Sequence, residues 1–420
     1  MGALRKHCCR TALRLLPGLL LLCNLSTAPA REPVTSITRD EITGILKHGP
    51  WPPPRGRDSS NRVSGNLQAV AFGERLFFDR RLSANGRIAC VTCHVPATGW
   101  TERQVTSTGI APTLRNAQSV VNAAFGRWFG WSGASDSLWA ASLRPLLDRA
   151  EMGSTERHVA ALIRSTSELA CHYRNTFGRV PEADDDGVFV NVGKALAAFQ
   201  ETLVSGRTPF DDFRDALARN DMAAAARYPP AALRGVRIFT GKGGCNTCHV
   251  GPHFTNGEFD KVGIAVRHGD GQFDWGRYDG IKTVLASRFN LQSRHNDNPT
   301  RANAISTRHV ALTQEAYGAF KVPGLRNVSL TAPYMHDGSL ANLRDVVRHY
   351  SEIDEIKLHI AASHPHAELG EELPSRPVQG VLRTLNLTEQ EIRDLVAFLE
   401  TLTEPRPLIS SPVAKPATCR

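Results

Sequence analysis

Two features that would assign whole classes of proteins are missing from this sequence. Beyond residue 30 it has no apolar run approaching the roughly 20 residues that a membrane-spanning helix needs. It also has no dense tract of lysine and arginine, which argues against nucleic acid as a partner. The composition is otherwise ordinary: 420 residues, 41% of them hydrophobic and 22% charged, describe a globular chain long enough for two domains.

The first 30 residues have the pattern of an export signal. They carry four basic and no acidic residues, an apolar run over 15–22, and an Ala28-Pro29-Ala30 end. We expect cleavage after Ala30, which lowers the formal net charge from +9 to +5, and delivery to an oxidising periplasm. A lipoprotein anchored through Cys23 is the alternative, although Leu22 is bulky where a small residue is expected.

Cysteine is scarce in the chain that export would leave. Six cysteines follow residue 30, and four of them form two Cys-x-x-Cys-His motifs, at Cys90–His94 and Cys245–His249. The remaining two, Cys171 and Cys419, could form a disulfide in an oxidising compartment. Their spacing alone leaves that pairing undecided.

Alternating strand patterns are also absent, and the chain is expected to be mainly α-helical. Apolar residues recur at three- and four-residue intervals over 66–78, 188–204 and 388–402, and Thr388 with Glu391 predicts a capping box at the start of the last helix. Segments recur in the same order: Gly73–Phe77 and Gly235–Phe239 before the motifs, PTLRN (112–116) and PGLRN (323–327) after them.

The repeat predicts two related modules fused in tandem, each with one Cys-x-x-Cys-His motif. We expect a signal peptide at 1–30, an arm or linker at 31–65, a first domain at 66–205, a second domain at 206–405, and a tail at 406–420. The polar, glycine-bearing segment 267–310 is expected to be a surface excursion over the second haem.

The two motifs predict c-type haems. Cys90 and Cys93, and likewise Cys245 and Cys248, could each bond one porphyrin, with His94 or His249 as the proximal iron ligand. Zinc or a redox dithiol is the alternative for one isolated Cys-x-x-Cys, but two copies that both end in histidine disfavour it. No histidine occurs from residue 95 through 157, so the iron held by His94 has no nearby histidine for its other face. An open iron is where peroxide can bind.

The chain resembles the bacterial di-haem cytochrome c peroxidases and their relative MauG. The resemblance covers roughly residues 66–402 and rests on four stretches: GERLFFDRRLSANGRIACVTCH, RNAQSVVNAAF, WSGASDSLWAASLRPLLDRAEMG and FKVPGLRNVSLTAPYMHDGSL. It implies two tandem cytochrome c-like domains, each with one covalently bound haem. The first haem would react with peroxide while the second relays electrons. Trp131 matches the tryptophan between the haems, and Glu151 and Pro145 match residues of the reactive pocket. Asn116, Thr331 and Pro333 match oxygen ligands of a calcium ion between the domains.

Two positions depart from the usual family pattern. Ala141 stands where these peroxidases usually have a glutamine. Tyr350, seventeen residues after Pro333, stands where they usually have a methionine and where MauG has a tyrosine. Tyr350 is therefore the expected second ligand of the iron held by His249, with His349 or Met335, or an open site, as alternatives. A tyrosinate would favour higher oxidation states of that iron.

Three functions follow as hypotheses. The first is a peroxidase that reduces hydrogen peroxide with electrons from a soluble c-type cytochrome or another periplasmic donor, with Glu151 moving a proton and Trp131 relaying oxidising equivalents. The second is a MauG-like enzyme that uses peroxide to oxidise residues of a partner protein. The third is an electron carrier without catalysis, in which both irons are six-coordinate and Glu151 has no role. The sequence leaves a homodimer open.

Overall fold

A computed structural model describes residues 37–264, 273–353, 382–406 and 419. The predicted signal peptide and most of the predicted tail lie outside the described residues. The fold is mainly helical, and β1 (Phe259–Asp260) and β2 (Phe320–Lys321) form a short antiparallel pair. Among the described residues, no helix is both long and apolar enough to cross a membrane.

The first hydrophobic core draws on residues between Val63 and Leu203, with Phe289 added from later in the chain. Its helices are α2 (Leu67–Phe77), α3 (Cys90–Cys93), α4 (Leu138–Leu147), α5 (Glu156–Ser165), α6 (Ser167–Phe177) and α7 (Asp185–Gln200). Helix α7 is buried along nearly its whole length because α2, α4 and α5 all pack against it. The periodic segments at 66–78 and 188–204 are thus confirmed as helices.

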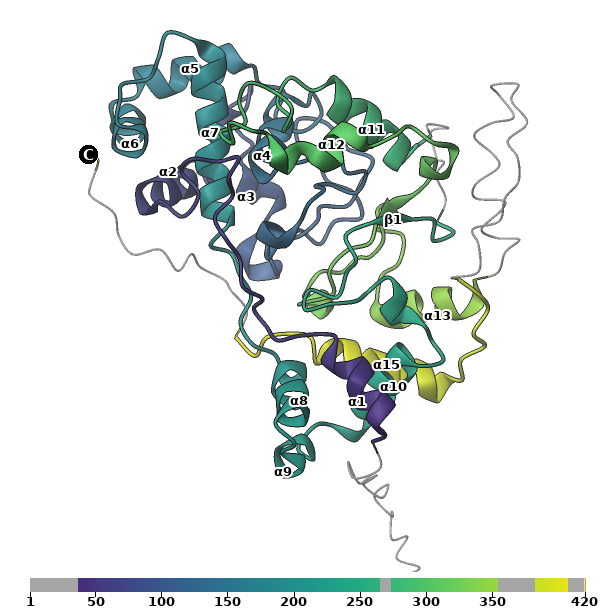
Figure 1. Ribbon diagram of the computed structural model, residues 1–420. Coiled ribbons are helices and arrows are strands. Elements are labelled where there is room, and N and C mark those ends of the chain that lie inside the picture. Colours follow the sequence, from purple (N-terminus) through teal and green to yellow (C-terminus); the bar gives the residue numbers. More distant parts are fainter. Residues whose placement is uncertain (1–36, 265–272, 354–381, 407–418, 420) are drawn as a thin grey trace, which may run out of the picture.

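A second hydrophobic core lies in the other half of the molecule (Figure 1). Its helices are α1 (Arg39–Leu46), α8 (Pro209–Ala218), α9 (Met222–Ala225), α10 (Pro230–Thr240), α13 (Leu343–Glu352) and α15 (Glu389–Glu400). The predicted capping box is present: Thr388 accepts from the Glu391 N–H while the Glu391 carboxylate accepts from the Thr388 N–H. Ile45 of α1 belongs to this core, so the N-terminal arm begins in the second core and reaches the first at Val63.

Each core is built around a helix pair that crosses at a glycine. A Cβ atom placed on Gly73 of α2 would lie 2.0 Å from the Ala195 carbonyl oxygen of α7. A Cβ atom on Gly235 of α10 would lie 2.0 Å from the Asp394 carbonyl oxygen of α15. The glycines of the sequence repeat are therefore the points at which the two backbones come closest.

Replacing Gly235 by alanine should lower the free energy of unfolding by about 1–3 kcal/mol, because the helices must separate to admit the methyl group. Gly44 of α1 is the matched control, since a Cβ atom there would meet Thr240 Cβ at an ordinary 3.6 Å. Urea unfolding followed by circular dichroism measures both. Equal stability of Gly235→Ala and Gly44→Ala would contradict the close approach.

Part of the segment 267–310, which follows the second motif, packs against the first core, a position that the sequence had not suggested. It contains α11 (Arg277–Ala286) and α12 (Ile305–His309), and Thr307 of α12 donates to Asp136, which lies just before α4 (2.7 Å). The Leu291 N–H donates to Asp136 (2.8 Å), and Lys194 Nζ of α7 donates to the His295 carbonyl (2.8 Å). The expectation that this excursion covers the second haem motif was wrong for residues 289–297, because buried polar contacts anchor them to the first core.

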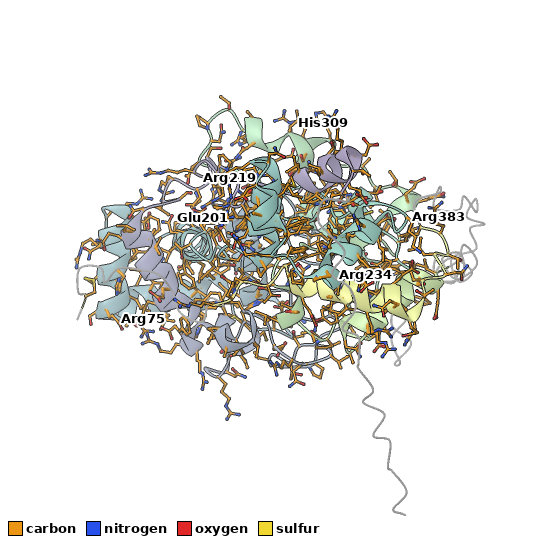
Figure 2. All side chains as sticks on the ribbon, turned by 90° about the horizontal axis from the view of Figure 1, so that it is seen from below. Arg75, Glu201, Arg219, Arg234, His309 and Arg383 are labelled. Atoms are coloured by element: carbon orange, nitrogen blue, oxygen red, sulfur yellow. A yellow bond between two sulfur atoms is a disulfide. The ribbon has the colours of Figure 1, made fainter. Side chains whose placement is uncertain are left out.

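Cys171 of α6 and Cys419 form a disulfide, which resolves the pairing that the sequence left open. It joins the end of the chain to the first core, across 248 residues of sequence. The view from below shows how far apart the two halves extend: Arg75 of α2 and Arg383, just before α15, lie toward opposite ends, with Glu201 between them (Figure 2).

Candidate functional site

The two Cys-x-x-Cys-His motifs open onto one cavity. Cys90 and Cys93 lie on α3, while Cys245 and Cys248 lie on a short 3-10 turn and its end. All four thiols are free and half-buried. Together with His94 and His249 they line a cavity of about 1740 Å³ between the two cores.

Both histidines are oriented in the same way. The Nδ1 atom of His94 lies 3.3 Å from the Trp100 carbonyl oxygen, and that of His249 lies 3.0 Å from the Phe254 carbonyl oxygen. A carbonyl only accepts, so Nδ1 carries the proton and the unprotonated Nε2 is left to bind a metal. Burial lowers the pKa of both imidazoles, which favours this neutral form.

The cysteines fit haem attachment better than the alternatives. Burial raises the pKa of Cys90 and Cys93 to about 12 and that of Cys245 and Cys248 to about 11, opposite to the lowered pKa of redox-active thiols. Within the described ranges, no three His, Cys, Asp or Glu side chains cluster as a zinc site requires. The cavity also exceeds the usual size of a pocket for one small ligand, so volume and donor set both fit two haems.

Helix α4 supplies one wall of the cavity near the first motif. Ala141, Ser142 and Pro145 all line it. Pro145 lies inside the helix and has no N–H to donate to the Ala141 carbonyl four residues earlier. The backbone hydrogen bonding of α4 is thus interrupted at the Ala141 carbonyl, and Ala141 is the position that departs from the family pattern.

Gln200 of α7 reaches the same wall, which the sequence did not predict. Its Nε2 donates to Ser142 Oγ (2.8 Å) and to the Leu196 carbonyl (3.2 Å), and only 7% of the residue is exposed. Both N–H groups of this amide are therefore used within the protein, so Gln200 does not replace the donor that Ala141 lacks.

Glu151 follows α4 and also lines the cavity. Its backbone is fixed because its N–H donates to Asp148 (3.2 Å) and its carbonyl accepts from the Ile110 N–H (2.9 Å). Its Oε1 atom lies 2.8 Å from Nη2 of Arg144, a cavity residue that the sequence reading missed. The charge of Glu151 raises the pKa of Arg144.

Trp131 lies between the segments that follow the two motifs. Its indole Nε1 donates to the Asn116 carbonyl (2.9 Å), and its own carbonyl accepts from the Lys321 N–H of β2 (2.8 Å). The Asn116 N–H in turn donates to the His336 carbonyl (2.8 Å). This chain of hydrogen bonds ties Trp131 to both halves of the molecule at the cavity wall.

The three residues matched to a calcium site also line the cavity. Asn116 Nδ2 donates to the Gln104 carbonyl (2.8 Å), and Thr331 Oγ1 donates to the Val328 carbonyl (3.1 Å). Pro333 follows a cis peptide bond. Calcium binding by Asn116, Thr331 and Pro333 stays a prediction.

The candidate ligands opposite His249 are now unequal. Tyr350 of α13 lines the cavity, and burial, reinforced by Cys248 and Cys245, raises the pKa of its phenol. His349 Nε2–H instead donates to the Val262 carbonyl (2.6 Å), and His349 does not belong to the cavity wall. Successive helix residues point about 100° apart, so α13 directs Tyr350 and not His349 toward the cavity. Met335 also lines it and stays an alternative.

Comparison with known proteins agrees with these features. The family model described as di-haem cytochrome c peroxidase matches residues 67–219. The methylamine utilization protein MauG of Methylorubrum extorquens is 33% identical over 339 residues, 80% of this chain and 78% of that protein. A cytochrome-c peroxidase of Denitromonas iodatirespirans is 33% identical over 353 residues, 81% of this chain and 82% of that protein.

Solved structures resemble the fold. One is a MauG-like protein associated with microbial copper homeostasis: TM-score 0.60 and 25% identity, covering 87% of this chain and 97% of that one. Another is the diheme peroxidase BthA from Burkholderia thailandensis, with a TM-score of 0.60 and 22% identity, covering 87% of this chain and 93% of that one.

Proposed function

The chain belongs to the di-haem cytochrome c peroxidase family, which includes MauG, and is thus an oxidoreductase; we propose that it reduces hydrogen peroxide on the His94 side of its cavity. The observation that carries the proposal is that Glu151 lines the cavity close enough to the first motif for its charge to add to burial in raising the pKa of Cys90 and Cys93. Membership of this family implies c-type haems, and the donor set at the two ends of the cavity fits them.

Cys90, Cys93 and His94 would hold one haem, and Cys245, Cys248 and His249 the other. When bound, the haems supply the two electrons that cleave the O–O bond of peroxide. The helix crossings at Gly73 and Gly235 support two cytochrome c-like domains, with boundaries near residues 66–205 and 206–405. Asn116, Thr331 and Pro333 remain the proposed calcium ligands between them.

Glu151 is the proposed proton carrier. Its carboxylate takes the proton from one oxygen of hydrogen peroxide and returns it to the other, so that the departing oxygen leaves as water. With two electrons and two protons, each peroxide yields two waters. Pro145 narrows the same pocket and, having no N–H, leaves the Ala141 carbonyl free to accept a hydrogen bond.

Trp131 is the proposed relay between the two sites, since its side chain and backbone contact both halves of the molecule. Electrons would enter on the His249 side from a soluble c-type cytochrome. Tyr350 favours a second candidate function, in which oxidising equivalents are withdrawn from residues of a partner protein, as in a MauG-like enzyme. An open coordination position on the His94 side would set both functions apart from an electron carrier.

We place this activity in the periplasm. The Cys171–Cys419 disulfide supports export, because disulfides persist in oxidising compartments. The predicted signal peptide and cleavage after Ala30 agree with this location.

Steady-state turnover with peroxide and a reduced c-type cytochrome tests the proposal. Oxidised protein should show one high-spin haem, react with peroxide without prior reduction, and then oxidise the cytochrome. Reaction with peroxide without cytochrome oxidation would favour the protein-oxidising function. No reaction with peroxide would leave the electron-carrier hypothesis.

A further inference from the structure

We propose that Arg144 binds the anionic form of the substrate on the His94 side of the cavity. This inference rests on the proposed function, since it concerns how peroxide is held there. No pattern in the sequence distinguishes this arginine from the other arginines of the chain. Its role follows from where α4 and the segment after it place three charged side chains.

Arg144 directly precedes Pro145 on α4. It lies three residues after Ala141, hence on nearly the same face, and belongs to the cavity wall. Its side chain is 41% accessible, so a large part of it is not covered by protein. Ala141, which has no side-chain hydrogen-bond donor, therefore has the charged donor of Arg144 as its neighbour on the same face of α4.

The guanidinium is only partly used by its protein partners. Nη2 lies 2.8 Å from Glu151 Oε1, a direct ion pair, while Nη1 is 3.5 Å from Asp148 Oδ2, beyond a good hydrogen bond. Asp148 is held in place separately, because its Oδ1 accepts from the N–H groups of Ala150 and Glu151. A guanidinium has five N–H donors, so donors remain for a ligand.

The neutral side chains that α4 and α7 contribute to this wall have no free N–H or O–H group to donate to an anion. Ala141 has no polar side-chain atom and Pro145 has no N–H. The Ser142 hydroxyl already donates to the Leu138 carbonyl (2.8 Å), and both N–H groups of Gln200 donate within the protein. Arg144 is thus the side chain in the α4 wall whose donors and charge suit an anion.

Glu151 and Arg144 would then act one after the other: Glu151 takes the proton, and Arg144 stabilises the anion that is left. When the Glu151 carboxylate takes a proton from hydrogen peroxide, an O–H bond of peroxide breaks, an O–H bond of the carboxyl forms, and a hydroperoxide anion remains. Arg144 loses its charged partner at that moment and faces the new negative charge instead. The total charge of the group is unchanged, so the arginine stabilises the anion without a further charge being buried.

Anion binding tests the inference without relying on turnover. The oxidised, haem-loaded protein is titrated with fluoride, a small anion, and separately with nitric oxide, a neutral ligand, and followed by absorption spectroscopy. Arg144→Gln should weaken fluoride binding by up to about a hundredfold to a thousandfold, the range found when one donor to a localised negative charge is removed. Nitric oxide affinity should stay within about twofold. Arg144→Lys should keep part of the fluoride affinity.

Arg149→Gln is the matched control. Arg149 is exposed, lies outside the cavity wall, and its replacement changes the net charge equally, so both affinities should stay within about twofold. Equal fluoride affinity of Arg144→Gln and Arg149→Gln, with nitric oxide still bound, would overturn the role of Arg144 alone. Wild-type protein that binds neither ligand on the His94 side would overturn the open site, and with it both proposals.

Discussion

Replacing Glu151 by glutamine should slow the reaction with hydrogen peroxide by about 10²–10⁴-fold, the usual contribution of a positioned acid–base group. Glutamine keeps the shape of the side chain and its length toward Arg144 but cannot take up a proton. Stopped-flow mixing of oxidised protein with peroxide measures the rate. The absorption spectrum before mixing should be unchanged, because the substitution leaves both Cys-x-x-Cys-His motifs intact.

Glu102 provides a matched carboxylate for this test. It lies close enough to Cys93 to influence its pKa, yet it is not part of the cavity wall. Glu102→Gln should alter the rate less than about threefold, since a group that cannot reach the substrate cannot carry its proton. A Glu151→Gln variant that reacts as fast as wild type would rule out Glu151 as the proton carrier.

Exchanging Tyr350 for methionine should raise the reduction potential of the second site by on the order of 100 mV or more. Axial ligands set haem potentials over about 0.8 V, and methionine opposite histidine raises the potential. Tyr350→Phe, which removes the ligand atom, should change the low-spin part of the spectrum. Potentiometric titration followed by absorption spectroscopy measures both variants.

His349 is the control for Tyr350 because it is adjacent on α13 but donates to the Val262 carbonyl. His349→Gln should leave the potential of the second site within about 20 mV, small against the range that ligand exchange covers. If Tyr350→Met and Tyr350→Phe leave the potential and the spectrum unchanged, Met335 becomes the ligand to test.

Local sequence patterns predicted the parts of this protein that depend on local interactions. The capping box at Thr388 and Glu391 involves residues three positions apart, and the helical periodicity of 66–78 and 188–204 is read within each segment. The Cys-x-x-Cys-His spacing is likewise local. These features form wherever the rest of the chain goes, so the sequence alone was sufficient.

The contacts that shape the pocket are not of this kind. Gln200 meets Ser142 across 58 residues, and Cys171 meets Cys419 across 248. Arg144 was overlooked because an arginine on a helix is usually a solvated charge; only the fold shows that it lies in a cavity wall beside Glu151. The polar composition of residues 289–297 predicted a surface position, which is correct for part of the segment. It did not indicate that the segment would pack against the first core.

The position of α1 has a consequence for how the molecule is assembled. Helix α1 (Arg39–Leu46), the first in the described part of the chain, belongs to a core whose other described helices follow residue 208. A chain that folds from its N-terminus can form the first core, Phe289 aside, while α1 still has no partner, so Ile45 and the apolar side of α1 stay exposed until the second core forms. Separate halves would each be incomplete, and a fragment that starts after α1 would leave the second core short of Ile45.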